Sequence, residues 1–207
     1  MRISGGGARG IPLLVPKGDA VRPATDKLRQ AVFSSLALRV PGARFLDLFA
    51  GSGAYGLEAL SRGAAGGTFV EKNPAAVACL RRNLAAACKS IGRDERGVTV
   101  ITGDAVGAGK WHGRPAHGIE NTGGTPVPLA DNAPDLVFID PPYEMIETVA
   151  ASLFARLTQA LEAKPEALVI FELPGSMDLA PAGWTLVKRL GKTKGDRQPT
   201  VAVFRKA

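Results

Sequence analysis

The tetrapeptide Asp140-Pro141-Pro142-Tyr143 brings together the residue types best suited to chemistry on an amino nitrogen. Such a nitrogen on a base ring is a poor nucleophile because its lone pair is delocalised. A carboxylate and a backbone carbonyl can accept its two N–H bonds and favour a pyramidal nitrogen whose lone pair faces a methyl donor. Asp140 and the Pro141 carbonyl suit this, since proline fixes φ and has no competing N–H. Tyr143 offers a face for stacking an extruded base. We predict these three as catalytic residues; a Pro-Pro turn that merely ends a strand is the alternative.

A glycine-rich loop at residues 47–56 supplies the second motif. Its glycines satisfy G-x-G-x-x-G, and Glu71 follows about twenty residues later. Taken alone, this spacing is typical of a dinucleotide site, with the acid on the ribose hydroxyls. Asp47, four residues before the first glycine, favours a different ligand. Its carboxylate would repel a pyrophosphate but suits the ammonium and sulfonium of S-adenosylmethionine.

The remaining cofactor contacts are expected from the ends of neighbouring strands. Glu71 keeps the ribose role with either ligand, and Asp104 can meet an adenine amine. No metal is expected. The predicted cofactor-binding residues are Thr25, Asp47, Phe49, Gly51, Gly53, Glu71, Lys72, Asp104 and Ala105.

An alternation of short apolar segments and helical patterns positions these motifs. The segments have no strict polar alternation, as expected of strands buried on both faces. Helical patterns occupy 54–62 and 74–89, the latter with Asn73 as N-cap and Pro74 at the first helical position. This order predicts an α/β fold with a doubly wound parallel sheet. The expected strands are 45–49, 68–71, 98–101, 136–139 and 168–171.

Both ends of the chain depart from this alternation. Residues 3–15 are predicted to form a hairpin-like segment, followed by a helix that starts at Thr25 or Asp26. Residues 184–190 and 201–204 predict an antiparallel hairpin that closes the sheet. We expect an N-terminal hairpin and helix extension at 1–40 on the substrate side, and a catalytic domain at 41–207.

Residues 107–134 are rich in Gly and Pro and lack any period. The stretch is longer than loops in compact domains usually are, which predicts a flexible surface insertion. It contains both histidines, His112 and His117, but nothing nearby supplies further metal ligands.

The net charge of +7 over 207 residues is distributed unevenly. Residues 1–44 hold eight basic and two acidic side chains, residues 45–180 hold eleven and sixteen, and residues 181–207 hold seven and one. Basic flanks around an acidic body suggest a polyanionic partner, although basic ends can also serve solubility alone. The basic turn at 188–197 follows the sixth strand and is expected to overhang Asp140. The residues predicted to contact nucleic acid are Arg9, Arg22, Arg29, Lys192, Lys194 and Arg197.

Composition and cysteine content narrow the classes of protein to which this chain could belong. No segment approaches the roughly 20 apolar residues of a membrane helix, and no signal-peptide core is present. Cys79 and Cys88 cannot form a disulfide framework or a four-ligand zinc site, and both are expected to pack in a helix. A covalent cysteine adduct is therefore disfavoured. We expect a cytoplasmic monomer without membrane or metal partners.

In four motifs, the sequence resembles the bacterial methyltransferases that modify the exocyclic amine of one guanine in small-subunit (16S) ribosomal RNA. The last two, the glycine loop and D-P-P-Y, are shared with many amino-methyltransferases, whereas the first two point to this family. The motifs are residues 1–6 with Arg9-Gly10, residues 22–26 with Arg29 and Phe33, residues 47–64, and residues 140–143.

The resemblance implies a class I S-adenosylmethionine-dependent methyltransferase with a Rossmann-like sheet of seven strands, the last antiparallel. It further implies guanine-N(2)-methylation of 16S ribosomal RNA, free or in an assembling small subunit. The 107–134 insertion departs from the family pattern. Amino-methylation of adenine or cytosine in DNA, a non-catalytic RNA-binding module and a nicotinamide oxidoreductase remain as alternatives.

Overall fold

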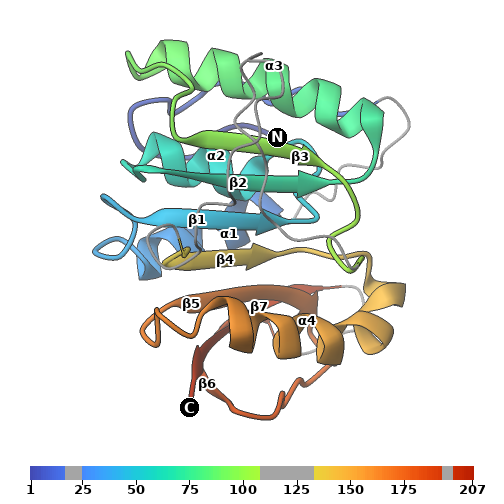
Figure 1. The fold of residues 1–207 in the computed structure, drawn as a ribbon. Helices are drawn as coiled ribbons and strands as arrows, with labels where there is room; N and C mark the ends of the chain where they lie inside the picture. The colour runs from blue at the N-terminus through green and yellow to red at the C-terminus, as the bar shows by residue number, and fades with distance from the viewer. Residues whose placement is uncertain (17–24, 108–132, 193–197) are drawn as a thin grey trace, which may run out of the picture.

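The computed structural model describes residues 1–16, 25–107, 133–192 and 198–207. For Thr25 it describes the backbone but not the side chain. Most of the 107–134 insertion and part of the 188–197 turn therefore lie outside the described residues. Figure 1 shows one sheet with helices on both of its faces. The helices are α1 (Thr25–Ser35), α2 (Ala54–Ser61), α3 (Pro74–Ser90), the short 3-10 helix η2 (Tyr143–Met145) and α4 (Ile146–Ala160).

Seven strands form this sheet in the order β3-β2-β1-β4-β5-β7-β6. The first five in sequence are parallel to one another, and β7 pairs antiparallel with both β5 and β6. The predicted α/β sheet with an antiparallel last strand is confirmed. The strands are β1 (Arg44–Leu48), β2 (Gly66–Glu71), β3 (Val98–Thr102), β4 (Leu136–Ile139), β5 (Leu168–Pro174), β6 (Trp184–Gly191) and β7 (Pro199–Lys206).

The central strands are buried on both faces, which explains their apolar runs. Phe45 belongs to the core that contains buried side chains of α1, α2 and α3, whereas its neighbour Leu46 belongs to the core under α4. Successive side chains of a strand point to opposite faces, so one apolar run serves two cores. The helix at 74–89 is also confirmed: Asn73 Oδ1 accepts hydrogen bonds from the backbone N–H groups of Ala75 and Ala76 at 2.9 and 3.4 Å.

The N-terminal segment folds back on itself and packs against α2. An antiparallel bridge joins Arg2 and Pro12, as the hairpin-like prediction requires. The N–H of Gly7 donates to the carbonyl of Ser61 at 2.8 Å, and the N–H of Ala8 donates to the Ser61 hydroxyl at 2.9 Å. Gly6 lies at φ +75°, and a β-carbon there would come within 1.9 Å of the Ser61 carbonyl oxygen. Only glycine permits this close approach.

Buried residues of this segment belong to the same core as the sheet. Ile3, Ala8 and Leu13 lie in the cluster that contains Phe33 of α1 and Leu57 of α2. The segment is thus fixed in place by apolar burial as well as by hydrogen bonds.

Candidate functional site

A cavity of about 430 Å³ opens at the carboxyl ends of β1, β2, β3, β4 and β5. Ligands bind at this edge in open α/β sheets. Four of its charged lining residues are acidic (Glu71, Asp104, Asp140 and Glu172) and two are basic (Arg29 and Lys72). The volume is within the ordinary range for small-molecule sites, and the acids make it a site for a cationic or donor-rich ligand.

The glycine loop forms the floor of this cavity and has an unusual backbone. Phe49 has φ 58°, Gly51 φ 55° and Gly53 φ 87°, so three of five consecutive residues lie in the left-handed region. A β-carbon on Gly53 would come within 2.2 Å of the Leu80 side chain. The glycines therefore allow both the turn and the close packing of α2 against its neighbours.

Asp47 lies beneath this loop and does not line the cavity. Its side chain is buried, and its Oδ2 accepts the backbone N–H of Gly56 at 2.9 Å. Burial raises the pKa of this carboxyl well above its ordinary value; the Gly56 hydrogen bond opposes the shift, while the charges of Asp140 and Glu71 add to it. Asp47 thus fixes the start of α2, and it is not among the residues that line the cavity.

Two acids follow the next strands at the cavity wall. Glu71 Oε2 accepts the N–H of Gly51 at 2.8 Å, and its Oε1 accepts the N–H of Asn73 at 2.7 Å. Asp104 Oδ1 accepts the N–H of Val106 at 2.9 Å. These bonds fix the orientation of both carboxylates. Lys72 and Ala105 line the cavity beside them.

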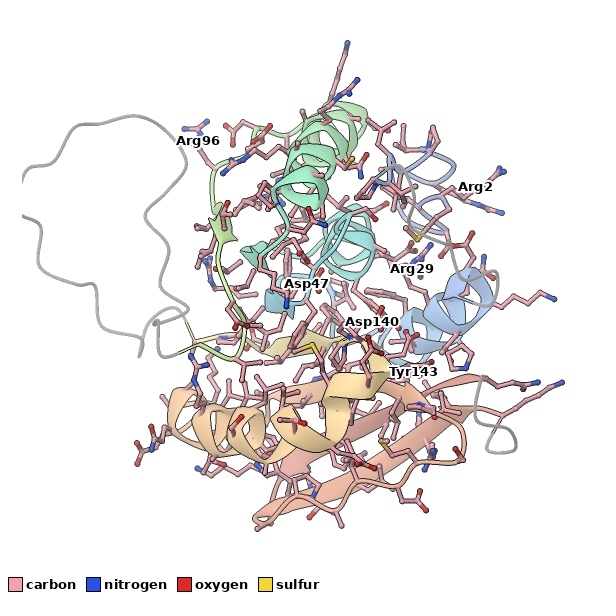
Figure 2. The ribbon with its side chains drawn as sticks, turned by 90° about the vertical axis from the view of Figure 1, so that its right-hand side faces the viewer. Arg2, Arg29, Asp47, Arg96, Asp140 and Tyr143 are labelled. Atoms are coloured by element: carbon pink, nitrogen blue, oxygen red, sulfur yellow. The ribbon has the colours of Figure 1, made fainter. Side chains whose placement is uncertain are left out.

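Asp140 and Pro141 reach the cavity directly from the end of β4, and Figure 2 shows Tyr143 beside Asp140. Tyr143 opens η2 and packs against the core cluster under α4, so it is not among the residues that line the cavity. Pro142 adopts an extended backbone and its carbonyl accepts the N–H of Met145 at 2.9 Å, which turns the chain into η2.

The sequence analysis missed a buried, hydrogen-bonded pair at this edge, formed by Tyr55 and Glu172. Glu172 of β5 is 2% exposed and lines the cavity, and its Oε2 accepts the Tyr55 hydroxyl at 2.8 Å. Burial raises the pKa of Tyr55 well above its ordinary value, and the negative charges of Glu172 and Asp140 raise it further. The available signal was an acid within the otherwise apolar strand LVIFELP.

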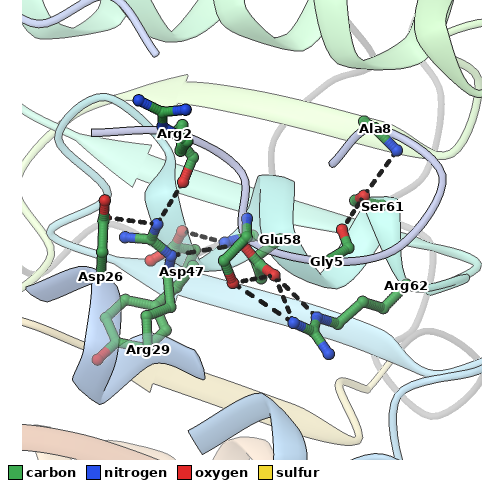
Figure 3. A network of polar contacts seen from close by, with 12 residues as sticks. Arg2, Gly5, Ala8, Asp26, Arg29, Asp47, Glu58, Ser61 and Arg62 are labelled. Atoms are coloured by element: carbon green, nitrogen blue, oxygen red, sulfur yellow. Dashed lines mark hydrogen bonds and ion pairs between the residues drawn. The ribbon is translucent and has the colours of Figure 1, made fainter. Parts of the chain in front are cut away.

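The expectation that Arg29 contacts nucleic acid is wrong in this structure. The side chain is only 1% exposed, because its guanidinium is bonded on several sides to the protein itself (Figure 3). It donates to Asp26 at 2.8 Å and to the Arg2 carbonyl at 2.5 Å, and it faces Glu58 at 3.5 Å. Arg29 therefore links α1, α2 and the N-terminal segment.

The other predicted nucleic-acid contacts divide into two groups. Arg9 and Lys192 are exposed, as such a role requires. Arg22, Lys194 and Arg197 lie outside the described residues. Thr25, which was predicted to bind the cofactor, is placed only as the first residue of α1.

Both cysteines lie in α3 and are free thiols, with Cys88 buried in the core. Among residues 1–16, 25–107, 133–192 and 198–207, no cluster of three or more His, Cys, Asp or Glu side chains could hold a metal ion. The described helices include none long and apolar enough to cross a membrane.

The strand order, the glycine loop under the cavity and the acid-Pro-Pro turn at the end of β4 define a class I methyltransferase. Methyltransferases of this class use S-adenosylmethionine, and an acidic cavity of this size fits that cationic cofactor. The chain belongs to the family described as conserved hypothetical protein 95, whose model matches residues 1–114.

Named relatives agree with this assignment. The chain is 34% identical over 192 residues to ribosomal RNA small subunit methyltransferase D of Escherichia coli (strain K12), covering 90% of this chain and 82% of the relative. It is 30% identical over 196 residues to the protein of the same name in Haemophilus influenzae, covering 94% and 89%. The solved structure of yhhF from Escherichia coli, a candidate methyltransferase, superposes with a TM-score of 0.67 at 30% identity, covering 100% and 97%.

Proposed function

We propose that the protein transfers a methyl group from S-adenosylmethionine to the exocyclic 2-amino group of a specific guanine in 16S ribosomal RNA during small-subunit assembly. The observation that carries the proposal is the opening of Asp140 and Pro141 into the cavity at the end of β4, above the glycine loop. The ribosomal RNA substrate is supported by the names of the relatives.

Asp140 and the carbonyl of Pro141 would each accept one N–H of the 2-amino group. This holds the nitrogen with its lone pair directed at the methyl carbon, so catalysis comes chiefly from orientation. S-Adenosylmethionine, when bound, would supply an activated methyl group on a sulfonium that leaves as a neutral thioether. The methylated nitrogen then loses one proton to Asp140, which returns it to solvent.

Other residues would hold the cofactor in place. Glu71 would accept the ribose hydroxyls and Asp104 the adenine amine, because both carboxylates are fixed at the cavity wall. Asp47 would act indirectly, by positioning the start of α2 through its hydrogen bond with Gly56. The further contacts we propose are Thr25, Phe49, Gly51, Gly53, Lys72 and Ala105.

RNA would approach from the open side of the cavity. Arg9 and Lys192 are exposed and are proposed for phosphate contacts, and Arg22, Lys194 and Arg197 are proposed for the same role from the sequence. Such contacts position the RNA backbone without reading bases. Tyr143 would stack on the extruded base after a local adjustment of η2. We propose that the enzyme acts as a monomer in the cytoplasm.

Tritiated methyl transfer tests the substrate. Small subunits from a strain lacking the enzyme are compared with duplex DNA as methyl acceptors, and the labelled nucleotide is then mapped. Label at the 2-amino group of one 16S guanosine is the expected result. Transfer only to adenine or cytosine of DNA, or no transfer to either acceptor, contradicts the proposal.

Replacement of Asp140 tests the mechanism. Asp140→Ala should reduce methyl transfer at least about 1,000-fold, since both the amine acceptor and its geometry are lost. S-Adenosylmethionine affinity, measured by calorimetry, should change less than about threefold. Turnover within tenfold of wild type would refute the assigned role.

A further inference from the structure

Glu172 lies next to Asp140 at the edge of the sheet. Strands β4 and β5 are parallel with Ile139 opposite Phe171, so one step further along both strands brings Asp140 beside Glu172. Neighbouring strands are about 4.8 Å apart, and both residues line the same cavity. The site therefore presents two carboxylates side by side, of which the D-P-P-Y motif accounts for only one.

The Glu172 carboxylate is held in a defined orientation. Its side chain is 2% exposed, and the Tyr55 hydroxyl donates to its Oε2 at 2.8 Å. The Tyr55 ring is in turn stacked on Phe138 with the centroids 5.3 Å apart. A carboxylate can accept several hydrogen bonds, so the one from Tyr55 orients the group without exhausting it. Burying a carboxylate costs free energy unless hydrogen-bond donors surround it. This position therefore favours a ligand that brings a donor.

The three amino-bearing bases differ in what lies beside the amine. Guanine carries an N1–H donor next to its 2-amino group. Adenine has an N1 acceptor next to its 6-amino group, and cytosine has an N3 acceptor next to its 4-amino group. A carboxylate adjacent to the amine acceptor attracts the first arrangement and repels the lone pair of the other two.

We propose that Glu172 accepts the N1–H of the target guanine while Asp140 accepts a hydrogen from its 2-amino group, so that Glu172 selects guanine. This inference rests on the proposed function. Tyr55 is then a positioning residue, which acts on the base only through Glu172.

The test uses a base that keeps the 2-amino group but lacks the N1–H. Small subunits are assembled from ligated 16S RNA that carries guanosine or 2-aminopurine riboside at the mapped nucleotide. Wild type should prefer guanosine by about 100-fold or more in kcat/KM, because sites built around a hydrogen-bond donor reject analogues that lack it. Glu172→Gln should lose about 10- to 100-fold with guanosine, the range for a hydrogen bond to a charged group.

The preference ratio is the decisive readout. The amide of Glu172→Gln can donate to N1 of 2-aminopurine, so the preference for guanosine should fall below about tenfold. Glu162→Gln makes the same charge change at an exposed position after α4 and should leave the ratio unchanged. A Glu172→Gln enzyme that loses activity equally on both substrates, with the ratio intact, overturns the proposal.

Tyr55→Phe provides a second measurement should Glu172→Gln not fold. It removes the hydroxyl that orients Glu172, so the ratio should fall about threefold or more, and an unchanged ratio counts against the assignment. Failure of the proposed function gives a different result: wild type would then not methylate guanosine-bearing subunits at all.

Discussion

Glu58 is the centre of the buried polar cluster in Figure 3, and its replacement by glutamine is expected to destabilise the protein strongly. The side chain is fully buried, and its carboxylate accepts the N–H and hydroxyl of Ser4, each at 2.7 Å. It also accepts Arg62 Nε at 2.8 Å and faces Arg29 Nε at 3.5 Å. Glu58→Gln removes the negative charge but keeps the shape, so the guanidinium of Arg29 loses its buried counter-charge.

Breaking a buried ion pair by removing one partner costs about 3–5 kcal/mol. For a chain of this size, each kcal/mol lowers Tm by about 2–4 °C, so we expect a decrease of about 6–20 °C. Thermal unfolding at pH 7 measures the decrease directly. Amide hydrogen exchange should also be faster for residues 3–13, because Ser4 loses its acceptor.

A matched exposed pair serves as the control. Glu166 is 69% exposed and bonded to Arg205 at 3.3 Å, so Glu166→Gln should change stability by less than about 0.5 kcal/mol. A Glu58→Gln decrease of less than about 2 °C would refute the argument that this cluster holds the N-terminal segment in place.

Two further predictions concern glycine geometry and a buried acid. Gly6→Ala should lower the free energy of unfolding by about 2–5 kcal/mol, because the new β-carbon meets the Ser61 carbonyl oxygen and φ is positive. Gly92→Ala is the control: its φ is positive but the space around it is open, so the loss should be only about 1–2 kcal/mol. Urea unfolding measures both. Asp47→Asn should raise Tm of the cofactor-free protein more at pH 8 than at pH 5. As the pH rises above the ordinary aspartate range, the unfolded chain releases the Asp47 proton, while the native state holds it longer because its pKa is raised. The free energy of unfolding of the wild type therefore falls with rising pH, whereas asparagine does not titrate and the variant lacks this loss. Equal Tm changes at both pH values would contradict this.

The features that could be predicted from sequence are those with local causes. The glycine loop, the turn after β4 and the Asn73 cap depend on residues within a few positions of one another, and their backbone requirements are visible in residue type alone. The strands were predicted because burial on both faces leaves continuous apolar runs.

The features that could not be predicted depend on distant partners. Arg29 resembles any basic residue of a polar helix until the fold brings Glu58 to it, and nothing near Arg29 in sequence reveals that carboxylate. Tyr55 and Glu172 meet across 117 positions. Basic side chains were therefore assigned to the surface by default, and the second acid of the cavity was overlooked.

The position of β7 between β5 and β6 has a kinetic consequence. Within the described part of the sheet, β6 pairs only with β7, so it joins through a strand that follows it in sequence. The β6–β7 hairpin is local and can form early, whereas pairing of β7 with β5 requires closure of a longer loop. We therefore expect the hairpin to add to β5 as one unit, so that the wall of the cavity that contains Glu172 gains its neighbouring strand in a single event.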